Sequence, residues 1–245
     1  MLVPLNDEVR MLHSSDILEP LSEEELADFA KNNTDVQLEE GEILFGPEEV
    51  GERLFIVKQG RIRLYKVGSE GNEITIAMVY PGKLFGELAL TAQRTREVYA
   101  QAAEPSLLIS LNREALENLI LEKPRVGLRL IERLSERVRA LESRLEDATL
   151  KEMPARLANL ILQLVENEGE RTEEGYHKIP THYSHDDLAS MVGANRVSVT
   201  RALGRLRESG VVELRRRLIY VKDLQALGNI ATESRRAKQI EDSEE

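Results

Sequence analysis

The chain has 245 residues, 41% of them hydrophobic, and a formal net charge of -11 at pH 7. This length suits two modest domains, and the hydrophobic content is sufficient for two cores. The absence of cysteine excludes disulfides, cysteine-ligated zinc and thiolate-ligated iron–sulfur clusters. The N-terminus lacks a basic region followed by an apolar run, and no segment approaches the roughly 20 apolar residues that span a bilayer. We therefore expect a cytoplasmic protein.

A short helix and a β-rich region come first in the chain. Ser22 to Glu25 form a helix-start pattern, in which a serine hydroxyl and a carboxylate three residues later cap free backbone N–H groups. Leu26 and Phe29 are the expected apolar contacts of this helix. Residues 36–111 alternate short apolar runs with frequent glycines, a pattern typical of an antiparallel roll or sandwich. The clearest strands are 54–57, 62–65 and 74–78, with a turn at 68–72 between the last two.

A long helical pattern follows the roll. Its apolar residues step by alternating threes and fours, which is typical of a coiled-coil seam. We expect this helix to pair with its counterpart in a parallel homodimer. Since only a few heptads are present, the alternative is a helix that lies on its own domain. The seam residues are Ile131, Leu134, Val138, Leu141, Leu145 and Ala148.

Two short helices joined by a turn are predicted between residues 184 and 210. Ser184 and Asp187 can form a capping pair at the start of the first helix. Gly193 can adopt the left-handed conformation that ends it, and Asn195 can cap the second helix. This pattern predicts a helix-turn-helix. The apolar stripe of its second helix is Val199, Ala202, Leu203 and Leu206.

Positive charge is concentrated between residues 196 and 217. Seven arginines and two glutamates lie there, a local charge of about +5 that favours a polyanion as partner. The β-prone runs Val211–Leu214 and Leu218–Val221, joined by Arg215-Arg216-Arg217, predict a hairpin wing with a cationic tip. Because the screening length at physiological salt is about 8 Å, the acidity of the rest of the chain has little influence at this surface. The alternative is an amphipathic helix pair with a solvated charged face.

Together these features resemble the Crp/Fnr family of transcription regulators over roughly residues 15–225. The resemblance implies an α+β fold with an N-terminal antiparallel β-roll of the cyclic-nucleotide-binding type, a long dimerisation helix and a C-terminal winged helix-turn-helix. The segment Arg196-Val-Ser-Val-Thr-Arg201 is similar to the nitrogen-control branch. The motifs that carry the resemblance are 38–45, 54–65, 82–90, 184–189 and 193–201. The expected domains are 1–127 (roll), 128–150 (dimerisation helix), 151–232 (winged helix-turn-helix) and 233–245 (flexible charged tail).

The resemblance also implies how DNA is read. Arginine suits guanine because its planar fork can meet O6 and N7 together. Val197 cannot accept a proton from cytosine N4 but can pack on a thymine methyl, so the implied half-site differs from TGTGA and resembles the GTA…TAC type. Double-stranded DNA with a palindromic operator and RNA polymerase are the implied partners. The residues placed at base edges are Arg196, Val197, Thr200 and Arg201. Those expected to hold phosphates are Ser184, Asn195, Ser198, Arg215, Arg216 and Arg217.

The predicted effector pocket departs from the cyclic-AMP-binding members of the family. In those members a Gly-Glu pair and an Arg-Ser pair hold the phosphate and ribose, and a Thr-Ser pair on the dimer helix reads adenine. Here Glu97 falls at the serine, where a carboxylate would repel a phosphate, and Leu141-Glu142 replace Thr-Ser. We therefore do not expect cyclic AMP. The candidate pocket residues are Gly86, Glu87, Leu88, Arg96, Glu97, Leu141 and Glu142.

Three interpretations of this pocket stay open. In the first, Arg96 forms an internal salt bridge with Glu87 or Glu97. In the second, Arg96 binds a different anionic metabolite. In the third, the regulator has no effector and is controlled by its own abundance.

No cofactor is predicted. Haem needs an axial ligand, and the β-rich region 36–111 contains none of the four histidines, which are His13, His177, His182 and His185. The last three are explained by a polar loop that leads into a helix cap, so we predict no metal site. Phosphate-binding loops, nucleophile elbows and His-Glu-x-x-His patterns are absent from the sequence, which argues against an enzyme. The remaining alternative is a ligand-sensing module whose helix pair docks a protein partner rather than DNA.

Overall fold

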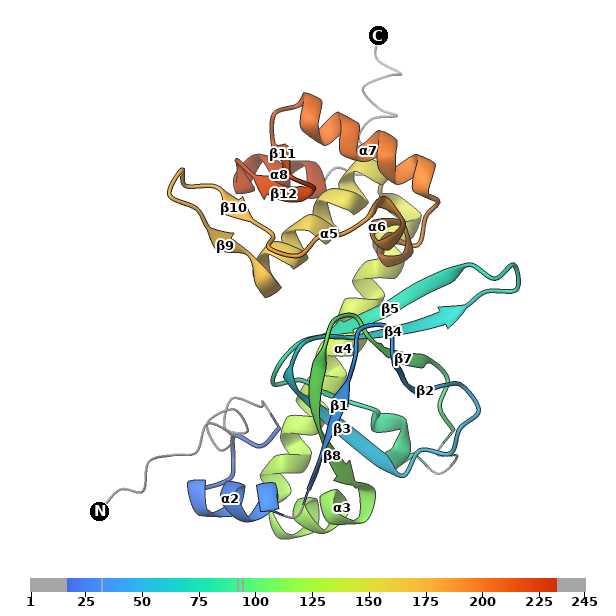
Figure 1. Cartoon of the computed structure of the whole chain (residues 1–245), viewed down its shortest axis with the longest axis vertical. Coiled ribbons are helices and arrows are strands. Elements are labelled where there is room, and N and C mark those ends of the chain that lie inside the picture. The colour runs from blue at the N-terminus through green and yellow to red at the C-terminus, as the bar shows by residue number, and fades with distance from the viewer. Residues whose placement is uncertain (1–16, 32, 92, 94, 233–245) are drawn as a thin grey trace. The chain divides into compact units, whose positions relative to one another are not determined.

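A computed structural model of the chain describes residues 17–31, 33–91, 93 and 95–232 (Figure 1). The predicted charged tail at 233–245 and His13 lie outside the described residues. The chain divides into two compact units, Met1–Val138 and Arg139–Glu245.

Two antiparallel four-stranded sheets form the N-terminal unit, which confirms the predicted roll. Their strand orders are β1-β8-β3-β6 and β2-β7-β4-β5. The three strands that were clearest in the sequence correspond to β3, β4 and β5. The eight strands are β1 (Thr34–Leu38), β2 (Ile43–Phe45), β3 (Arg53–Gln59), β4 (Ile62–Val67), β5 (Glu73–Val79), β6 (Leu84–Phe85), β7 (Tyr99–Ala102) and β8 (Ser106–Asn112).

Strand β3 is buried on both faces and separates two apolar clusters. Successive side chains of a strand point to opposite faces, so Phe55 belongs to the cluster between the sheets while Leu54 and Ile56 belong to the other. In the first cluster, the Phe55 and Phe85 rings stack with centroids 5.4 Å apart. In the second, the sheet is covered by Leu26 and other side chains from short helices. These helices are α2 (Glu23–Lys31), the 3-10 helix η1 (Glu87–Leu90) and α3 (Arg113–Glu122).

The long helix α4 runs from Pro124 to Leu150 and thus begins before the expected residue 128. Proline is tolerated at the first position of a helix because the N–H it lacks has no intrahelical partner there. The large apolar residues of the predicted seam are all exposed within the single chain, among them Ile131 at 60% and Leu145 at 70%. Each unit contains part of α4, because the boundary at Val138 falls within it.

The C-terminal unit is the predicted winged helix-turn-helix with additional elements. Its sheet has the order β11-β12-β10-β9, so the wing pairs with a second hairpin that was not predicted. One apolar cluster joins its helices and sheet. The elements are α5 (Met153–Glu168), β9 (Glu170–Arg171), β10 (His177–Lys178), α6 (His185–Val192), α7 (Arg196–Glu208), β11 (Val212–Arg215), β12 (Leu218–Val221) and α8 (Leu224–Thr232). Every helix in the described ranges is too short or too polar to cross a membrane.

Candidate DNA interface and effector cradle

A side-chain cap fixes the start of α6, and a glycine and one arginine hold the turn between α6 and α7. Ser184 and Asp187 form the predicted capping box, in which the Ser184 hydroxyl accepts from the Asp187 N–H at 3.1 Å. Gly193 ends α6 with φ +65, a left-handed conformation that glycine adopts without steric penalty. Arg156, from α5, donates to the carbonyls of Val192 and Gly193. The start of α7 therefore has a defined position on the body of the domain.

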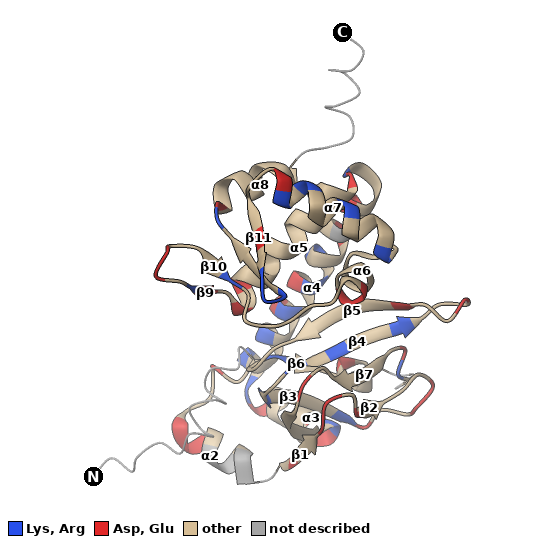
Figure 2. Ribbon diagram, turned by 45° about the horizontal axis from the view of Figure 1, so that its top comes forward, with Lys and Arg blue, Asp and Glu red and all other residues tan. Residues whose placement is uncertain are grey.

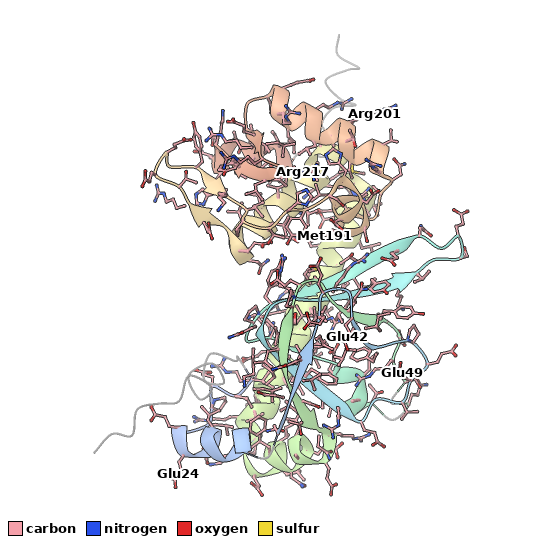
Figure 3. The ribbon with its side chains drawn as sticks, viewed as in Figure 1. Glu24, Glu42, Glu49, Met191, Arg201 and Arg217 are labelled. Atoms are coloured by element: carbon pink, nitrogen blue, oxygen red, sulfur yellow. The ribbon has the colours of Figure 1, made fainter. Side chains whose placement is uncertain are left out.

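Helix α7 buries one face and exposes the other, as predicted. Asn195 caps it by accepting from the Ser198 N–H at 2.8 Å. On the exposed face Val197 is 58% accessible, and Arg201 stands on the outer side of the helix (Figure 3). Arg196 lies 3.7 Å from Asp186, with both side chains mostly in solvent, so this pair is weak and readily broken. The face therefore presents two arginines and an apolar side chain together.

Thr200, predicted to face the bases, makes two contacts within the protein. Its hydroxyl donates to the Arg196 carbonyl at 2.9 Å. The Nδ1 atom of His185, the first residue of α6, lies 2.8 Å from the same hydroxyl oxygen. Sequence reasoning missed this role of His185, because the two residues come from different helices and no local pattern relates them.

The wing ends in a two-residue turn of two arginines. Arg215 pairs with Leu218 across the hairpin, and the residues between them, Arg216 and Arg217, have φ +50 and +68. Two positive φ values in a two-residue loop define a type I′ turn, where Asn-Gly is preferred. Both arginines are exposed, and in Figure 2 the loop that follows β11 is drawn in the blue of Lys and Arg. The predicted cationic tip is confirmed.

Arg215 has a different environment from the other two wing arginines. It donates to Glu213 at 2.9 Å and to Glu174 of the β9–β10 hairpin at 2.8 Å. Its guanidinium also lies over the rings of Tyr176 and Tyr220. Hydrogen bonds from Arg215 and then Lys222 lower the pKa of Glu213 to about 2, and those to Glu213 and Glu174 raise the pKa of Arg215. Arg215 thus links the β9–β10 and β11–β12 hairpins by hydrogen bonds. Its expected phosphate contact stays a prediction.

The predicted effector cradle of the roll is arranged around Arg96. This side chain is 5% exposed and donates to the carbonyls of Gly86 at 2.8 Å and Arg53 at 2.5 Å. Its guanidinium carbon lies 4.2 Å from the centroid of the Phe45 ring. Burial lowers the pKa of Arg96, an effect that the nearby Glu87 and Glu49 carboxylates oppose. A Cβ at Gly51 would lie 2.5 Å from the same guanidinium carbon, so glycine there gives it room.

The other predicted pocket residues are distributed over several environments. Glu87 pairs with Arg137 of α4, and Glu97 pairs with Lys66 of β4 at 3.4 Å. In the described part of the chain, neither carboxylate forms an ion pair with Arg96, so of the interpretations left open the internal salt bridge is not formed, and Arg96 donates to two carbonyls instead. Leu88 is half-buried in η1. Leu141 and Glu142 lie in the second unit, where both are exposed on α4.

No group of three or more His, Asp or Glu side chains suited to a metal ion occurs among the described residues.

Comparison with known proteins identifies the family. Residues 35–123 match the cyclic nucleotide-binding domain family, and residues 155–230 match the Crp-like helix-turn-helix domain family. The chain is 33% identical to a global nitrogen regulator of Synechococcus elongatus over 187 residues, which span 76% of this chain and 84% of the relative. It belongs to the Crp/Fnr family.

Other Crp/Fnr proteins agree with this assignment. A CRP-like cAMP-activated global transcriptional regulator of Mycobacterium tuberculosis is 28% identical over 84% of this chain and 92% of its own length. The crystal structure of a CRP/FNR family transcriptional regulator from Thermus thermophilus superposes with a TM-score of 0.70 and 28% identity, covering 82% of this chain and 99% of that one. This Crp/Fnr protein is therefore a transcription regulator with a helix-turn-helix DNA-binding domain, and not an enzyme.

The cradle contains two side chains that the sequence prediction omitted. Arg137 lies four residues before Leu141 on the same helix, so helical spacing places both on one face and offered a signal for it. Phe45 comes from β2, far from the Gly-Glu motif in the chain, and no local signal predicted its contact with Arg96.

Proposed function

We propose that this Crp/Fnr protein is a homodimer that reads a palindromic operator by inserting α7 of each protomer into successive major grooves. The observation that carries the proposal is the exposed face of α7, where Arg196 and Arg201 flank the apolar Val197. Guanine offers paired acceptors to an arginine fork, and thymine offers a methyl to valine. A half-site of the GTA…TAC type supplies both a guanine for an arginine and a thymine methyl for Val197.

The exposed seam of α4 supports the homodimer. Large apolar side chains repeat along one stripe of this helix and lie in solvent in the single chain. Exposed contiguous apolar surface of this kind marks an interaction site, and a stripe with coiled-coil spacing suits a second copy of the same helix. Two copies of α7 held about 34 Å apart would meet grooves one helical turn apart.

We infer further that cyclic AMP is not the effector. Arg96, which falls where the cyclic-AMP-binding members hold the phosphate, is already buried against two carbonyls and the Phe45 ring. A bound phosphate would have to displace those contacts and lie near the Glu87 and Glu49 carboxylates, whose charges act on Arg96. RNA polymerase is the expected protein partner, and the cytoplasm the expected location, because a transcription regulator acts at the promoter.

The oligomeric state and the DNA site are tested together. Analytical ultracentrifugation of the wild-type chain should give a dimer, and a selection of bound genomic fragments should return a palindrome. Leu145→Glu should give monomers that lose the palindrome, because a charge then lies within the apolar seam. Glu146→Gln, a change at an exposed neighbour on the same helix, is the matched control and should stay dimeric. A wild-type chain that remains monomeric and shows no preference for any duplex would overturn the proposal.

The effector is tested by titration calorimetry with cyclic AMP and 2-oxoglutarate, followed by operator affinity in the presence of each. We expect no heat from cyclic AMP and an unchanged operator affinity. Micromolar binding of cyclic AMP that strengthens operator binding would contradict this part of the proposal and leave the DNA reading intact.

A further inference from the structure

The Thr200 hydroxyl makes two hydrogen bonds within the protein. A hydroxyl has one proton to donate and two lone pairs. The proton goes to the Arg196 carbonyl, so the Nδ1 atom of His185 at 2.8 Å has to act as the donor to the hydroxyl oxygen. This requires a proton on Nδ1, which both the Nδ1–H tautomer and the doubly protonated ring provide. The contact therefore holds the threonine in one rotamer.

That rotamer decides which part of Thr200 is available to a ligand. The threonine Cβ carries a hydroxyl, a methyl and a hydrogen in three staggered positions. With the hydroxyl turned back to its own helix, the methyl and the hydrogen occupy the other two positions. Thr200 is exposed and its hydroxyl is held by two protein partners, so the methyl is the group of this side chain that has no protein hydrogen bond and can contact a base. Val197, three residues earlier on the helix, adds a second apolar group that is 58% accessible.

We infer that Thr200, together with Val197, recognises the 5-methyl group of a pyrimidine in each half-site, and that His185 is a positioning residue that keeps the Thr200 hydroxyl away from the bases. This inference rests on the proposed insertion of α7 into the major groove. The 5-methyl group is the apolar feature of that groove, and it occurs in thymine and in 5-methylcytosine. Recognition at this position is therefore by methyl contact rather than by a hydrogen bond.

The test uses the full-length dimer and its selected operator. Each thymine of the half-site is replaced singly by deoxyuridine, which removes only the 5-methyl group, and dissociation constants are measured by fluorescence anisotropy. For wild type we expect at least one position where uracil weakens binding by about fourfold, the amount expected for one buried methyl-sized group.

Two substitutions at Thr200 separate its methyl from its hydroxyl. Thr200→Val keeps a methyl and removes the hydroxyl, so the uracil penalty should persist. Thr200→Ser keeps the hydroxyl and removes the methyl, so the penalty should vanish at one thymine. Arg216→Ala, at the wing tip, is the matched control and should leave every uracil penalty unchanged. A penalty that survives in Thr200→Ser and disappears in Thr200→Val would overturn the inference, because the hydroxyl would then be the reading group.

The His185 variants test the positioning role. His185→Ala removes the donor to the hydroxyl oxygen and leaves the Arg196 carbonyl as its one protein partner, so the hydroxyl is held less firmly and the uracil penalty at the Thr200-dependent thymine should fall. His185→Asn, which retains a donor near the place of Nδ1, should restore it. If His185→Ala weakens the thymine and uracil duplexes by equal factors, His185 has no positioning role. The deoxyuridine series in wild type needs no substitution in the protein, so a variant that fails to fold leaves the methyl test in place.

The source of the methyl group is distinguished by a third set of duplexes. Replacing the recognised thymine pair by a 5-methylcytosine pair should retain more affinity than the unmethylated cytosine pair, by the same factor of about four. A selected operator without thymine in the half-site, or one insensitive to every uracil replacement, would overturn the inference while specific binding upheld the proposed function. Failure of wild type to prefer any duplex over a scrambled one would instead count against the proposed function itself.

Discussion

Arginine has opposite environments in the two units of this protein. In the roll, Arg96 is buried and both ends of its guanidinium donate to backbone carbonyls. In the helix-turn-helix, Arg201, Arg216 and Arg217 are exposed and form no ion pair with any described residue. A buried guanidinium stabilises only if its donors are satisfied, whereas an exposed one contributes little to stability. The first therefore serves the fold, and the others are available to a ligand.

The wing tip is a second example of arginines that do not serve the fold. Its two exposed arginines occupy a turn in which another residue type would make the folded protein more stable. Non-glycine residues in the left-handed region cost about 1–2 kcal/mol each, and Arg216 and Arg217 both have positive φ. A turn of Asn-Gly would avoid that strain. Charge at the tip is therefore retained against a local conformational preference, which is expected where the residues serve binding rather than folding.

The largest effect is expected from removing the buried arginine. Arg96→Ala leaves the carbonyls of Gly86 and Arg53 without their donor, so the free energy of unfolding of the roll should fall by about 3 kcal/mol. Arg96→Lys keeps the charge but cannot bridge both carbonyls, so its free energy of unfolding should lie between those of wild type and Arg96→Ala. Urea unfolding followed by far-UV circular dichroism measures both, with Arg217→Ala as an exposed control. An Arg96→Ala roll as stable as wild type would remove the contrast between buried and exposed arginines.

The next effect concerns the exposed arginines of α7 and of the wing tip. Arg201→Ala should cost about 1–3 kcal/mol of discrimination at the guanine it contacts, because a paired fork contact to O6 and N7 is lost. Its affinity for a scrambled duplex should change much less. Arg216→Ala should instead lower the salt dependence of binding by about 0.9 in slope for each lost phosphate contact. Titrations on operator and scrambled duplexes at several salt concentrations test this division, and equal behaviour of the two variants would count against it.

A smaller effect of opposite sign is expected at the wing turn. Replacing Arg216-Arg217 by Asn-Gly should stabilise the C-terminal unit by about 1 kcal/mol, since the turn strain is relieved. The same change should weaken operator binding and flatten its salt dependence, because two cationic side chains are lost from each protomer. Thermal unfolding and anisotropy on one preparation give both values. A variant that gains stability and keeps full affinity would show that the tip does not contact DNA.

The smallest effect concerns the hairpin contacts of Glu213. Its pKa is lowered to about 2 from an ordinary value of 4.5, so its ionised form stabilises the folded wing. That stabilisation is fully present above pH 4.5 and is lost as the pH falls toward 2. Thermal unfolding of wild type and Glu213→Gln should therefore differ most near neutral pH and converge as the pH falls below 4.5. A difference independent of pH would exclude this ionic contribution.

Local features of the fold were predictable because their partners are close in the chain. The capping box of α6 joins Ser184 and Asp187, three residues apart, and the Gly193 turn and the Asn195 cap need only neighbouring residues. The strands followed from short apolar runs, and the wing from two β-prone runs around three arginines. Such patterns depend on backbone geometry and side-chain periodicity, which a sequence displays directly.

Contacts between distant segments could not be predicted in this way. Arg96 reaches Arg53 across 43 residues, Arg137 reaches Glu87 across 50, and Arg215 reaches Glu174 across 41. The sequence analysis therefore left an internal salt bridge as one of three interpretations for Arg96, and it assigned phosphate contacts to all three wing arginines without distinguishing Arg215. The structure instead satisfies Arg96 with carbonyls and places Arg215 in a network between hairpins.

By itself, the amino-acid sequence determined the order of the domains, the helix-turn-helix with its caps, and the cationic character of α7 and the wing. Each of these depends on residues within a few positions of one another. Only the tertiary structure decided which arginines are buried, which groups accept their hydrogen bonds, and that His185 meets Thr200. Those outcomes depend on which segments the folded chain brings together, and side-chain partners from separate elements leave no periodic trace in the sequence.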